Sequence, residues 1–191
     1  VTPFREDFTI DVEALDRLVE HIVTGGADFI VVLGTTAETP TLSPEERDFV
    51  ARRVVEKTAG RLPLVLGVGG NCTRSVCDEL SGRDLSGYSA ILSVVPFYNK
   101  PTQEGIFCHY CDIAEASPVP VILYNVPGRT GRNMTAETTL RLAQIPNIIG
   151  VKEASGDLDQ IYEIVERKPD GFEVLSGDDA ITIPLLRPGV S

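Results

Sequence analysis

Six short, largely apolar runs recur along the chain and constrain its fold more than any other feature. Runs of this kind, rich in Val, Ile and Leu, are typical of parallel strands that are buried on both faces. Their first residues are 29, 64, 90, 121, 148 and 173, so successive starts lie 35, 26, 31, 27 and 25 residues apart. This spacing leaves room for one crossover helix between neighbouring strands, as a βαβ unit requires. The predicted strands cover residues 29–33, 64–68, 90–95, 121–126, 148–151 and 173–175.

Helix signals occupy the segments between these runs. Apolar residues at positions 12, 15, 18, 19 and 22 fall on one face of a predicted helix. Ser43 opens a Ser-Pro-Glu-Glu sequence that provides an N-cap, a proline at the first helical position and a capping-box glutamate. Asp157 precedes another apolar face, and residues 103–116 are also predicted to be helical. No linker-like segment interrupts the pattern, so residues 1–191 are interpreted as a single α/β domain.

Polar residues follow the carboxyl ends of several predicted strands. Chemistry spread over many strand ends is typical of a (β/α)8 TIM barrel, and no glycine-rich nucleotide fingerprint follows the first strand. A closed barrel has eight strands and only six are countable here, so we expect a fragment that lacks part of the first strand and the C-terminal elements. The strand-end residues are Thr35, Thr36, Asn71, Tyr98, Tyr124, Asn125, Lys152, Glu153, Ser176, Gly177 and Asp178.

The chain is strongly acidic, with a formal net charge of −11 at pH 7. An acidic chain is unsuited to nucleic acid, which binds to basic surfaces, and local cations must hold any anionic substrate. No apolar stretch approaches the roughly 20 residues of a membrane helix, and no signal-peptide pattern opens the chain. We therefore expect a cytoplasmic protein without a nucleic-acid or membrane partner.

The four cysteines allow two interpretations. Cys108 and Cys111 form a C-x-x-C sequence around His109, which would suit a metal or redox site. These residues fall inside a predicted helix, however, and Cys72 and Cys77 lack the spacing of a zinc ribbon. Free, partly buried thiols and no metal site are the favoured expectation.

Lys152 lies at the carboxyl end of a predicted apolar strand, which is an unusual place for a charged side chain. Strand alternation puts Ile148, Gly150 and Lys152 on one face, and Ile149 and Val151 on the other. If that face lines the barrel, desolvation lowers the pKa of Lys152 and favours the neutral amine that attacks carbonyl carbons. Gly150 would leave space beside it for a small 2-keto acid.

Other interpretations of the strand ends remain open at this point. Lys152 could instead form an ion pair with Glu153 or Asp178 at the barrel rim. A glycosidase would need two facing carboxylates, which are not clearly placed. A serine or cysteine hydrolase is weaker still, because both histidines, His21 and His109, lie in predicted helices and no G-x-S-x-G sequence occurs.

Four motifs that occur in order carry a resemblance to a known family. They span essentially the whole chain, and the chain resembles the dihydrodipicolinate synthase family within the pyruvate-dependent class I aldolases. The motifs are Gly-Thr-Thr-Ala-Glu-Thr at 34–39, Pro-Phe-Tyr-Asn-Lys-Pro at 96–101, Tyr-Asn-Val-Pro-Gly-Arg-Thr-Gly at 124–131 and Gly-Val-Lys-Glu-Ala at 150–154.

The resemblance implies catalytic roles for four of these residues. Lys152 would form a Schiff base with pyruvate, and Tyr124 would shuttle protons near the imine nitrogen. Thr35 would link Tyr124 to Tyr98, which would act across a dimer interface in the neighbouring subunit's site. A dimer would then be the minimal active unit, and a homotetramer built from two dimers is expected.

The resemblance also implies substrate-binding residues. Thr36 would hold the pyruvate carboxylate, Arg129 the carboxylate of aspartate semialdehyde, and the carbonyl of Gly177, which follows Ser176, would lie close to the lysine. Structural alternatives exist for these positions: the two threonines could cap a turn, Tyr124 could pack on the rim and Arg129 could pair with Glu153.

The activity implied is condensation of pyruvate with L-aspartate 4-semialdehyde to 4-hydroxy-tetrahydrodipicolinate, a step of lysine and diaminopimelate biosynthesis. This hydro-lyase reaction proceeds through the lysine imine, so no metal or other cofactor is expected. Two alternatives stay open. One is another lyase of the group, acting on N-acetylneuraminate or a keto-deoxy sugar acid, and the other is a catalytically silent sensor with the same fold.

Two departures from the family's pattern are expected to have consequences. Ala37 replaces a glycine, and its methyl group would crowd the turn if that position needs a positive φ. The site for feedback by lysine that some members have is only partly matched: Asn71 is retained, Phe97 replaces a tyrosine, Ser75 replaces a glutamate, and Pro44 and Arg47 replace two histidines. We therefore predict weak or absent inhibition by lysine.

Overall fold

The computed structural model describes residues 1–186 and residue 190. By its internal packing the chain divides into two compact units. The first comprises residues 1–67 and 84–90, and the second comprises residues 68–83 and 91–191. No helix among the described residues is both long and apolar enough to cross a membrane.

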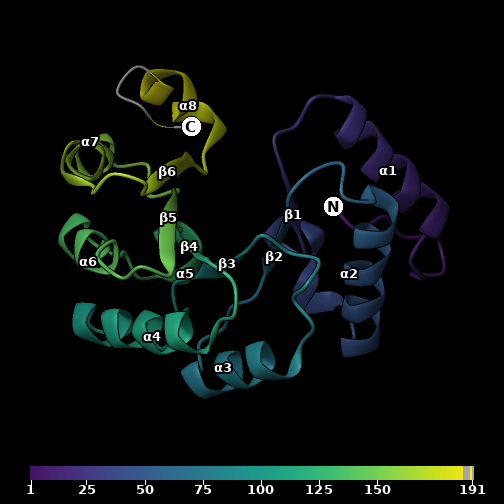
Figure 1. Ribbon diagram of the computed structural model, residues 1–191, viewed down its shortest axis with the longest axis horizontal. Helices are drawn as coiled ribbons and strands as arrows, with labels where there is room; N and C mark the ends of the chain where they lie inside the picture. Colours follow the sequence, from purple (N-terminus) through teal and green to yellow (C-terminus); the bar gives the residue numbers. More distant parts are fainter. Residues whose placement is uncertain (187–189, 191) are drawn as a thin grey trace. The chain divides into compact units, whose positions relative to one another are not determined.

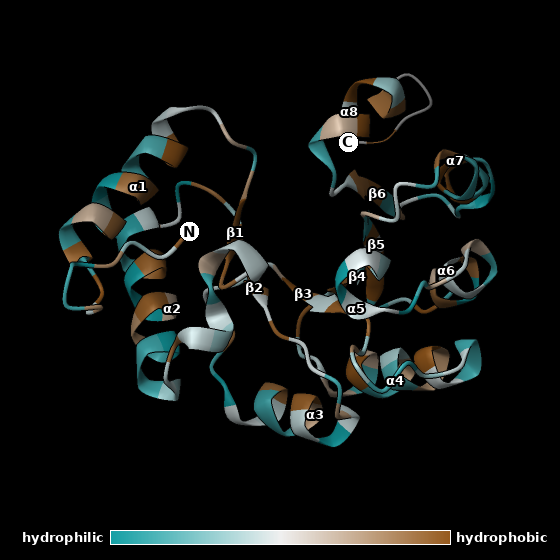
Figure 2. Ribbon diagram, turned by 180° about the vertical axis from the view of Figure 1, so that it is seen from behind, coloured by the Kyte–Doolittle hydropathy of each residue, from teal (hydrophilic) through white to brown (hydrophobic). Residues whose placement is uncertain are grey.

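The first unit contains two parallel strands and two long helices. Strand β1 (Ile30–Val32) pairs with β2 (Leu64–Gly67), with Ile30 opposite Leu64. Helices α1 (Val12–Thr24) and α2 (Pro44–Thr58) lie side by side (Figure 1). Both carry apolar as well as polar residues, as amphipathic helices do (Figure 2). Two short 3-10 helices, η1 (Thr35–Ala37) and η2 (Thr39–Thr41), connect β1 to α2.

The second unit is built around four parallel strands in sequential order, β3 (Ala90–Val94, of which Ala90 is assigned to the first unit), β4 (Val121–Asn125), β5 (Ile148–Glu153) and β6 (Glu173–Ser176). Helices α4, α6 and α7 follow one another along one face of β4 to β6 (Figure 1). The helices of this unit are α3 (Thr73–Gly82), α4 (Gln103–Ala116), α5 (Pro127–Thr130), α6 (Ala136–Leu142), α7 (Leu158–Arg167) and α8 (Asp179–Leu186).

The core of the second unit lies between its strands and these helices. Every residue of β4 is buried, as expected for a parallel strand that is covered on both faces. Tyr110 of α4 is fully buried, and its hydroxyl donates a hydrogen bond of 2.9 Å to the Ser93 carbonyl. Burial of this hydroxyl raises the pKa of Tyr110.

The predicted strands and helix starts are confirmed, with small shifts at their ends. The capping box at Ser43 forms: its backbone N–H donates to Glu46 Oε2 at 2.8 Å, and the Glu46 N–H donates to Ser43 Oγ at 3.2 Å. Asp157 caps α7 in the same way through the N–H of Gln160, at 3.1 Å. Strand β5 runs two residues further than predicted and therefore includes Lys152.

One prediction about β5 is wrong, because the strand contains a bulge. Ile148 pairs with Val121 on β4, whereas Gly150 pairs with Ile122, so Ile149 is the extra residue. Val121 and Ile122 are consecutive and point to opposite faces, and their partners do the same. Ile148 therefore does not share the face of Gly150 and Lys152.

Candidate active site

Lys152 and Tyr124 are direct neighbours on adjacent strands. They are paired in the register of β4 with β5, so their side chains leave the sheet on the same face. The Lys152 Nζ lies 4.6 Å from the centre of the Tyr124 ring. An amine over an aromatic ring at this distance is within the range of a cation–π contact. The strand pairing thus brings together Lys152 and Tyr124, two of the residues predicted to be catalytic.

The amine of Lys152 is partly buried and has no counter-ion among the residues that the structure describes. It makes no hydrogen bond or ion pair with any described residue, so the alternative pairing with Glu153 or Asp178 is not found there. Burial lowers the pKa of Lys152, the positive charge of Arg129 lowers it further, and Asp179 opposes the shift. The net lowering of the pKa favours a larger share of the neutral, nucleophilic amine at neutral pH.

Tyr124, whose ring lies beside this amine, keeps its hydroxyl protonated. Its side chain is buried, and burial raises the pKa of the phenol, with a smaller opposing effect from Arg129. Within the described residues its hydroxyl makes no hydrogen bond. A phenol of this kind can donate a proton to a neighbouring group and accept one back.

Gly177 allows the stem of Lys152 to lie where it does. A β-carbon at this position would lie 3.0 Å from Lys152 Cε and 2.9 Å from the β-carbon of Ala154. The Gly177 N–H donates to the Glu153 carbonyl at 2.8 Å, which ties the end of β6 to the end of β5. A side chain at position 177 would therefore displace the amine-bearing side chain.

Gly150 has a different role from the one predicted. A β-carbon there would lie 2.6 Å from the backbone oxygen of Glu173. The missing side chain thus admits the backbone of β6 to a close approach, and the space expected for a substrate beside Lys152 is taken up by this strand.

Arg129 lies on the surface in the short helix α5, which follows β4. Its backbone N–H donates to the Val126 carbonyl at 2.9 Å, and its side chain is exposed. The guanidinium forms no ion pair with any described residue. The alternative pairing with Glu153 is not found in this part of the chain, because Glu153 is buried among Asn125, Ser155 and Gln160.

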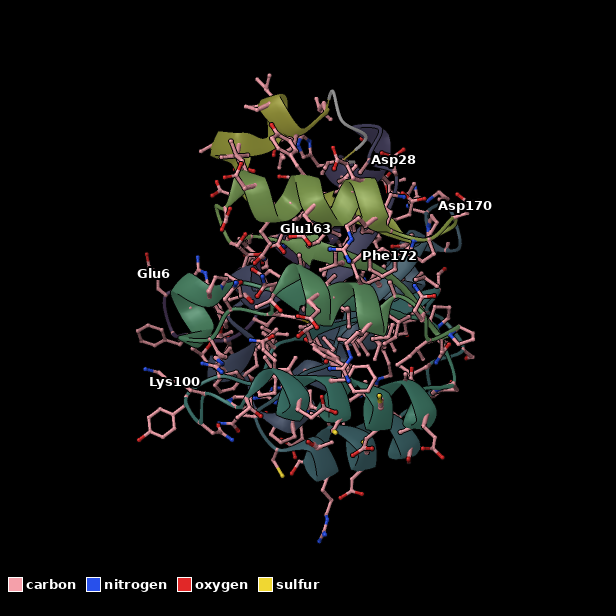
Figure 3. The ribbon with its side chains drawn as sticks, turned by 90° about the vertical axis from the view of Figure 1, so that its left-hand side faces the viewer. Glu6, Asp28, Lys100, Glu163, Asp170 and Phe172 are labelled. Carbon is pink, nitrogen blue, oxygen red and sulfur yellow. The ribbon has the colours of Figure 1, made fainter. Side chains whose placement is uncertain are left out.

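Tyr98 lies in a loop with an unusual backbone conformation. Its φ is 70° and that of Lys100 is 49°. Both angles lie in the left-handed region, which is energetically unfavourable for residues other than glycine. The side chain of Tyr98 is 90% exposed. Figure 3 shows Lys100 projecting outward at the edge of the molecule. No contact links Tyr98 to Lys152 or Tyr124 within the described residues.

Thr35 and Thr36 belong to the first compact unit, in η1. Both are exposed, and neither hydroxyl bonds to the turn or to another described residue, so the capping alternative is not found. The predicted crowding at Ala37 does not occur, because Ala37 does not have a positive φ; the left-handed position in this turn is Glu38, with a φ of 58°. The Ala37 carbonyl accepts a 2.7 Å hydrogen bond from Thr2 Oγ1.

The cysteines carry free thiols: Cys72 and Cys108 are exposed, and Cys77 and Cys111 are partly buried. Among the described residues, no three His, Cys, Asp or Glu side chains are grouped in a way that could hold a metal ion.

A polar cluster that was not predicted from the sequence lies behind Lys152. Glu153 is buried with its carboxylate bonded to Asn125 and Gln160, whereas its predicted alternative role was that of an ion-pair partner. The signal was present in the sequence, because Asn125 and Glu153 directly follow Tyr124 and Lys152 on neighbouring strands.

The comparison with known families shows which family the chain belongs to. The model of the dihydrodipicolinate synthetase family matches residues 1–191. The chain belongs to this family. Its relatives include the 4-hydroxy-tetrahydrodipicolinate synthases of Parabacteroides distasonis, 58% identical over 99% of this chain and 64% of that protein, and of Flavobacterium psychrophilum, 56% identical over 100% and 66%.

Solved structures of the dihydrodipicolinate synthetase family have the same fold. The enzyme from Thermotoga maritima matches with a TM-score of 0.95 at 39% identity, over 100% of this chain and 66% of that one. The chloride-inhibited enzyme from Acinetobacter baumannii, complexed with pyruvate, matches with a TM-score of 0.95 at 42% identity, over 100% and 65%. The barrel prediction is confirmed, and the chain spans 64 to 66% of the length of the curated relatives named above.

Proposed function

We propose that the intact protein condenses pyruvate with L-aspartate 4-semialdehyde through a Schiff base on Lys152 and forms 4-hydroxy-tetrahydrodipicolinate. The observation that carries this proposal is the unpaired, partly buried amine 4.6 Å from the Tyr124 ring. The names of the relatives and the pyruvate complex of the Acinetobacter enzyme support the same substrate.

The Lys152 amine acts as the nucleophile in the first step and as the leaving group in the last. Lys152 Nζ adds to carbon 2 of pyruvate, and loss of water gives an iminium ion. The iminium makes the methyl group acidic, and removal of one methyl proton gives an enamine. The enamine carbon attacks the aldehyde carbon, whose oxygen takes up a proton. The amino group of the second substrate then adds to the iminium carbon, and the Lys152 amine leaves as the ring closes.

Every one of these steps moves a proton, which is the role proposed for Tyr124. Its protonated hydroxyl can donate to the carbinolamine oxygen that leaves as water, and the phenolate can then accept a proton. Thr35 and Tyr98 would extend this path to solvent as a relay. The 90% exposure of Tyr98 supports a role in a neighbouring subunit, with a homodimer as the minimal active unit and a homotetramer as the assembly.

Cations and polar groups would hold the two anionic substrates against a net charge of −11. Arg129 has no counter-ion among the described residues, so its guanidinium is available for the carboxylate of the semialdehyde. Thr36 would bind the pyruvate carboxylate, and the Gly177 backbone would line the site beside Lys152.

The proposed setting is lysine and diaminopimelate biosynthesis in the cytoplasm, without a metal or other cofactor. The Lys152 iminium supplies the electron sink that a metal or a cofactor supplies in other aldol reactions.

A substrate competition tests this function. The intact protein is assayed with pyruvate paired either with aspartate semialdehyde or with N-acetylmannosamine. The proposal predicts turnover with the semialdehyde. Preference for the sugar would assign the protein to the N-acetylneuraminate lyases, and no turnover with either would favour a silent sensor.

A further inference from the structure

A buried carboxylate lies directly behind the reactive lysine. Glu153 follows Lys152 at the end of β5, so its side chain leaves the strand on the opposite face. The residue has no exposed surface. A buried carboxylate is costly unless hydrogen bonds satisfy it, so its surroundings indicate what it does.

The partners of Glu153 are all hydrogen-bond donors. Asn125 Nδ2 donates to Oε1 at 3.0 Å and lies 3.2 Å from Oε2, the Ser155 N–H donates to Oε1 at 2.9 Å, and Gln160 Nε2 donates to Oε2 at 3.2 Å. No cation among the described residues pairs with it. Burial raises the pKa of Glu153, and these hydrogen bonds oppose the shift. A surrounding made only of donors suits a carboxylate held in one fixed orientation.

Asn125 connects this carboxylate to the strand that carries Tyr124. Asn125 pairs with Glu153 in the register of β4 with β5, one residue beyond the pair of Tyr124 with Lys152. The two pairs leave the same two strands on opposite faces. Asn125 is itself fixed, because its Oδ1 accepts from the Met134 N–H at 3.0 Å and its Nδ2 lies 2.8 Å from Asn133 Oδ1.

We propose that the hydrogen-bonded pair of Asn125 and Glu153, the Asn125–Glu153 clamp, positions Tyr124 against Lys152 for proton transfer at the imine. Glu153 is thus a positioning residue that touches no substrate. The inference rests on the proposed Schiff-base function.

The clamp acts by fixing the position of Tyr124 and does not act on the pKa of Lys152. The pKa of Lys152 is shifted by burial, by Arg129 and by Asp179, and Glu153 is not among these causes. The substitution Glu153→Gln keeps the shape of the side chain but turns one acceptor into a donor. In either orientation the new amide N–H groups would face at least one N–H of Asn125, Ser155 or Gln160, so part of the hydrogen bonding of the clamp is lost.

A double-mutant cycle separates positioning from general damage. Glu153→Gln, Tyr124→Phe and the double variant of the intact protein are incubated with pyruvate in deuterium oxide, and exchange of the methyl protons is followed by NMR. Glu153→Gln should slow exchange about tenfold when Tyr124 is present, but by less than about twofold in the Tyr124→Phe background. Equal slowing in both backgrounds, or no slowing in either, would overturn the clamp.

Two further variants complete the test. Glu163→Gln makes the same chemical change on the solvent side of α7, where Glu163 pairs with Arg167 (Figure 3), and should leave exchange unchanged. Gln160→Met removes one donor to Glu153 and should slow exchange in the same direction by a smaller factor, which keeps the test decisive if Glu153→Gln does not fold. Slowing by Glu163→Gln as large as that by Glu153→Gln would contradict the clamp.

Failure of the clamp differs from failure of the proposed function. Borohydride trapping of pyruvate on the unsubstituted protein reports the Schiff base directly. Absence of an adduct there overturns the function and the clamp together. An adduct on the unsubstituted protein, combined with equal slowing in both backgrounds, overturns the clamp alone.

Discussion

Lys152 differs from the other three lysines in its surroundings. Lys57 lies in the last turn of α2, and Lys168 caps α7 and donates to the Phe172 carbonyl, positions where a positive charge suits the helix dipole. Lys100 is exposed (Figure 3). Lys152 instead ends a buried strand and lies over an aromatic ring without a counter-ion among the described residues. Its chemistry therefore depends on the few atoms that keep water and carboxylates away.

Gly177 tests this dependence at the scale of one atom. In Gly177→Ala the new methyl group would lie 3.0 Å from Lys152 Cε, so the lysine side chain must move. We expect the rate of pyruvate trapping by borohydride to fall about tenfold and the free energy of unfolding to fall by about 1–2 kcal/mol.

The matched control for Gly177→Ala is Gly82→Ala at the end of α3. A β-carbon at Gly82 would meet nothing within 4 Å. Gly82→Ala should therefore leave the rate of pyruvate trapping unchanged. Unchanged trapping in Gly177→Ala would show that Lys152 tolerates displacement and would contradict this part of the account.

At the scale of elements, regular strands and capped helices were predictable and irregular pairing was not. The apolar runs and the caps at Ser43 and Asp157 are local properties of the sequence, and local rules predicted them. The bulge at Ile149 depends on the register between two strands, and the close approach at Gly150 depends on the backbone of Glu173. Alternation within one strand cannot reveal either, which is why both expectations failed.

The packing of α3 against α4 should make stability depend on pH. His109 of α4 is buried and bonded through Nδ1 to Thr73 Oγ1 at 2.8 Å, and burial lowers the pKa of His109 to about 4. The unfolded chain binds this proton at a higher pH, near the ordinary histidine pKa of about 6.5. The stabilisation is therefore complete above pH 6.5 and is lost as the pH falls toward 4.

Urea unfolding at pH 7 and pH 5 measures this contribution. His109→Gln keeps a polar side chain but cannot titrate, so its loss of stability between the two pH values should be smaller by about 2 kcal/mol than that of the unsubstituted protein. Equal losses in the two proteins would mean that His109 is protonated in the folded state at pH 5.

At the scale of the whole molecule, the proposed role of Tyr98 involves a second chain. Lys152, Tyr124, Gly177 and the Asn125–Glu153 clamp lie in the second unit, whereas Thr35 and Thr36 lie in the first. Tyr98 is exposed on a strained loop of the second unit. Residue types and the order of the motifs predicted these site residues from the sequence. The contacts at a subunit interface depend on a second chain, so the sequence of one chain does not predict them.

Mixing two defective variants tests the role of Tyr98 across subunits. Lys152→Ala lacks the nucleophile and Tyr98→Phe lacks the relay hydroxyl, so each homodimer should be nearly inactive. After unfolding and refolding together in equal amounts, about a quarter of the sites should combine an intact lysine with an intact partner tyrosine. Activity no higher than the sum of the two separate variants would contradict a shared site.

The partly matched residues for lysine feedback allow a prediction about regulation of the assembly. Arg47 donates through Nε to the carbonyls of Thr39 and Leu42, both at 3.2 Å, which fixes its positive charge at one of the positions expected to depart from the feedback site. We expect millimolar lysine to leave the initial rate of the intact protein nearly unchanged. Submillimolar inhibition in a steady-state assay would contradict this.

Mass spectrometry after borohydride reduction in the presence of pyruvate shows directly whether Lys152 forms the Schiff base. We expect one pyruvate-derived adduct on the intact protein, located on the peptide that carries Lys152 and missing in Lys152→Arg. An adduct on another lysine, or normal turnover by Lys152→Arg, would contradict it.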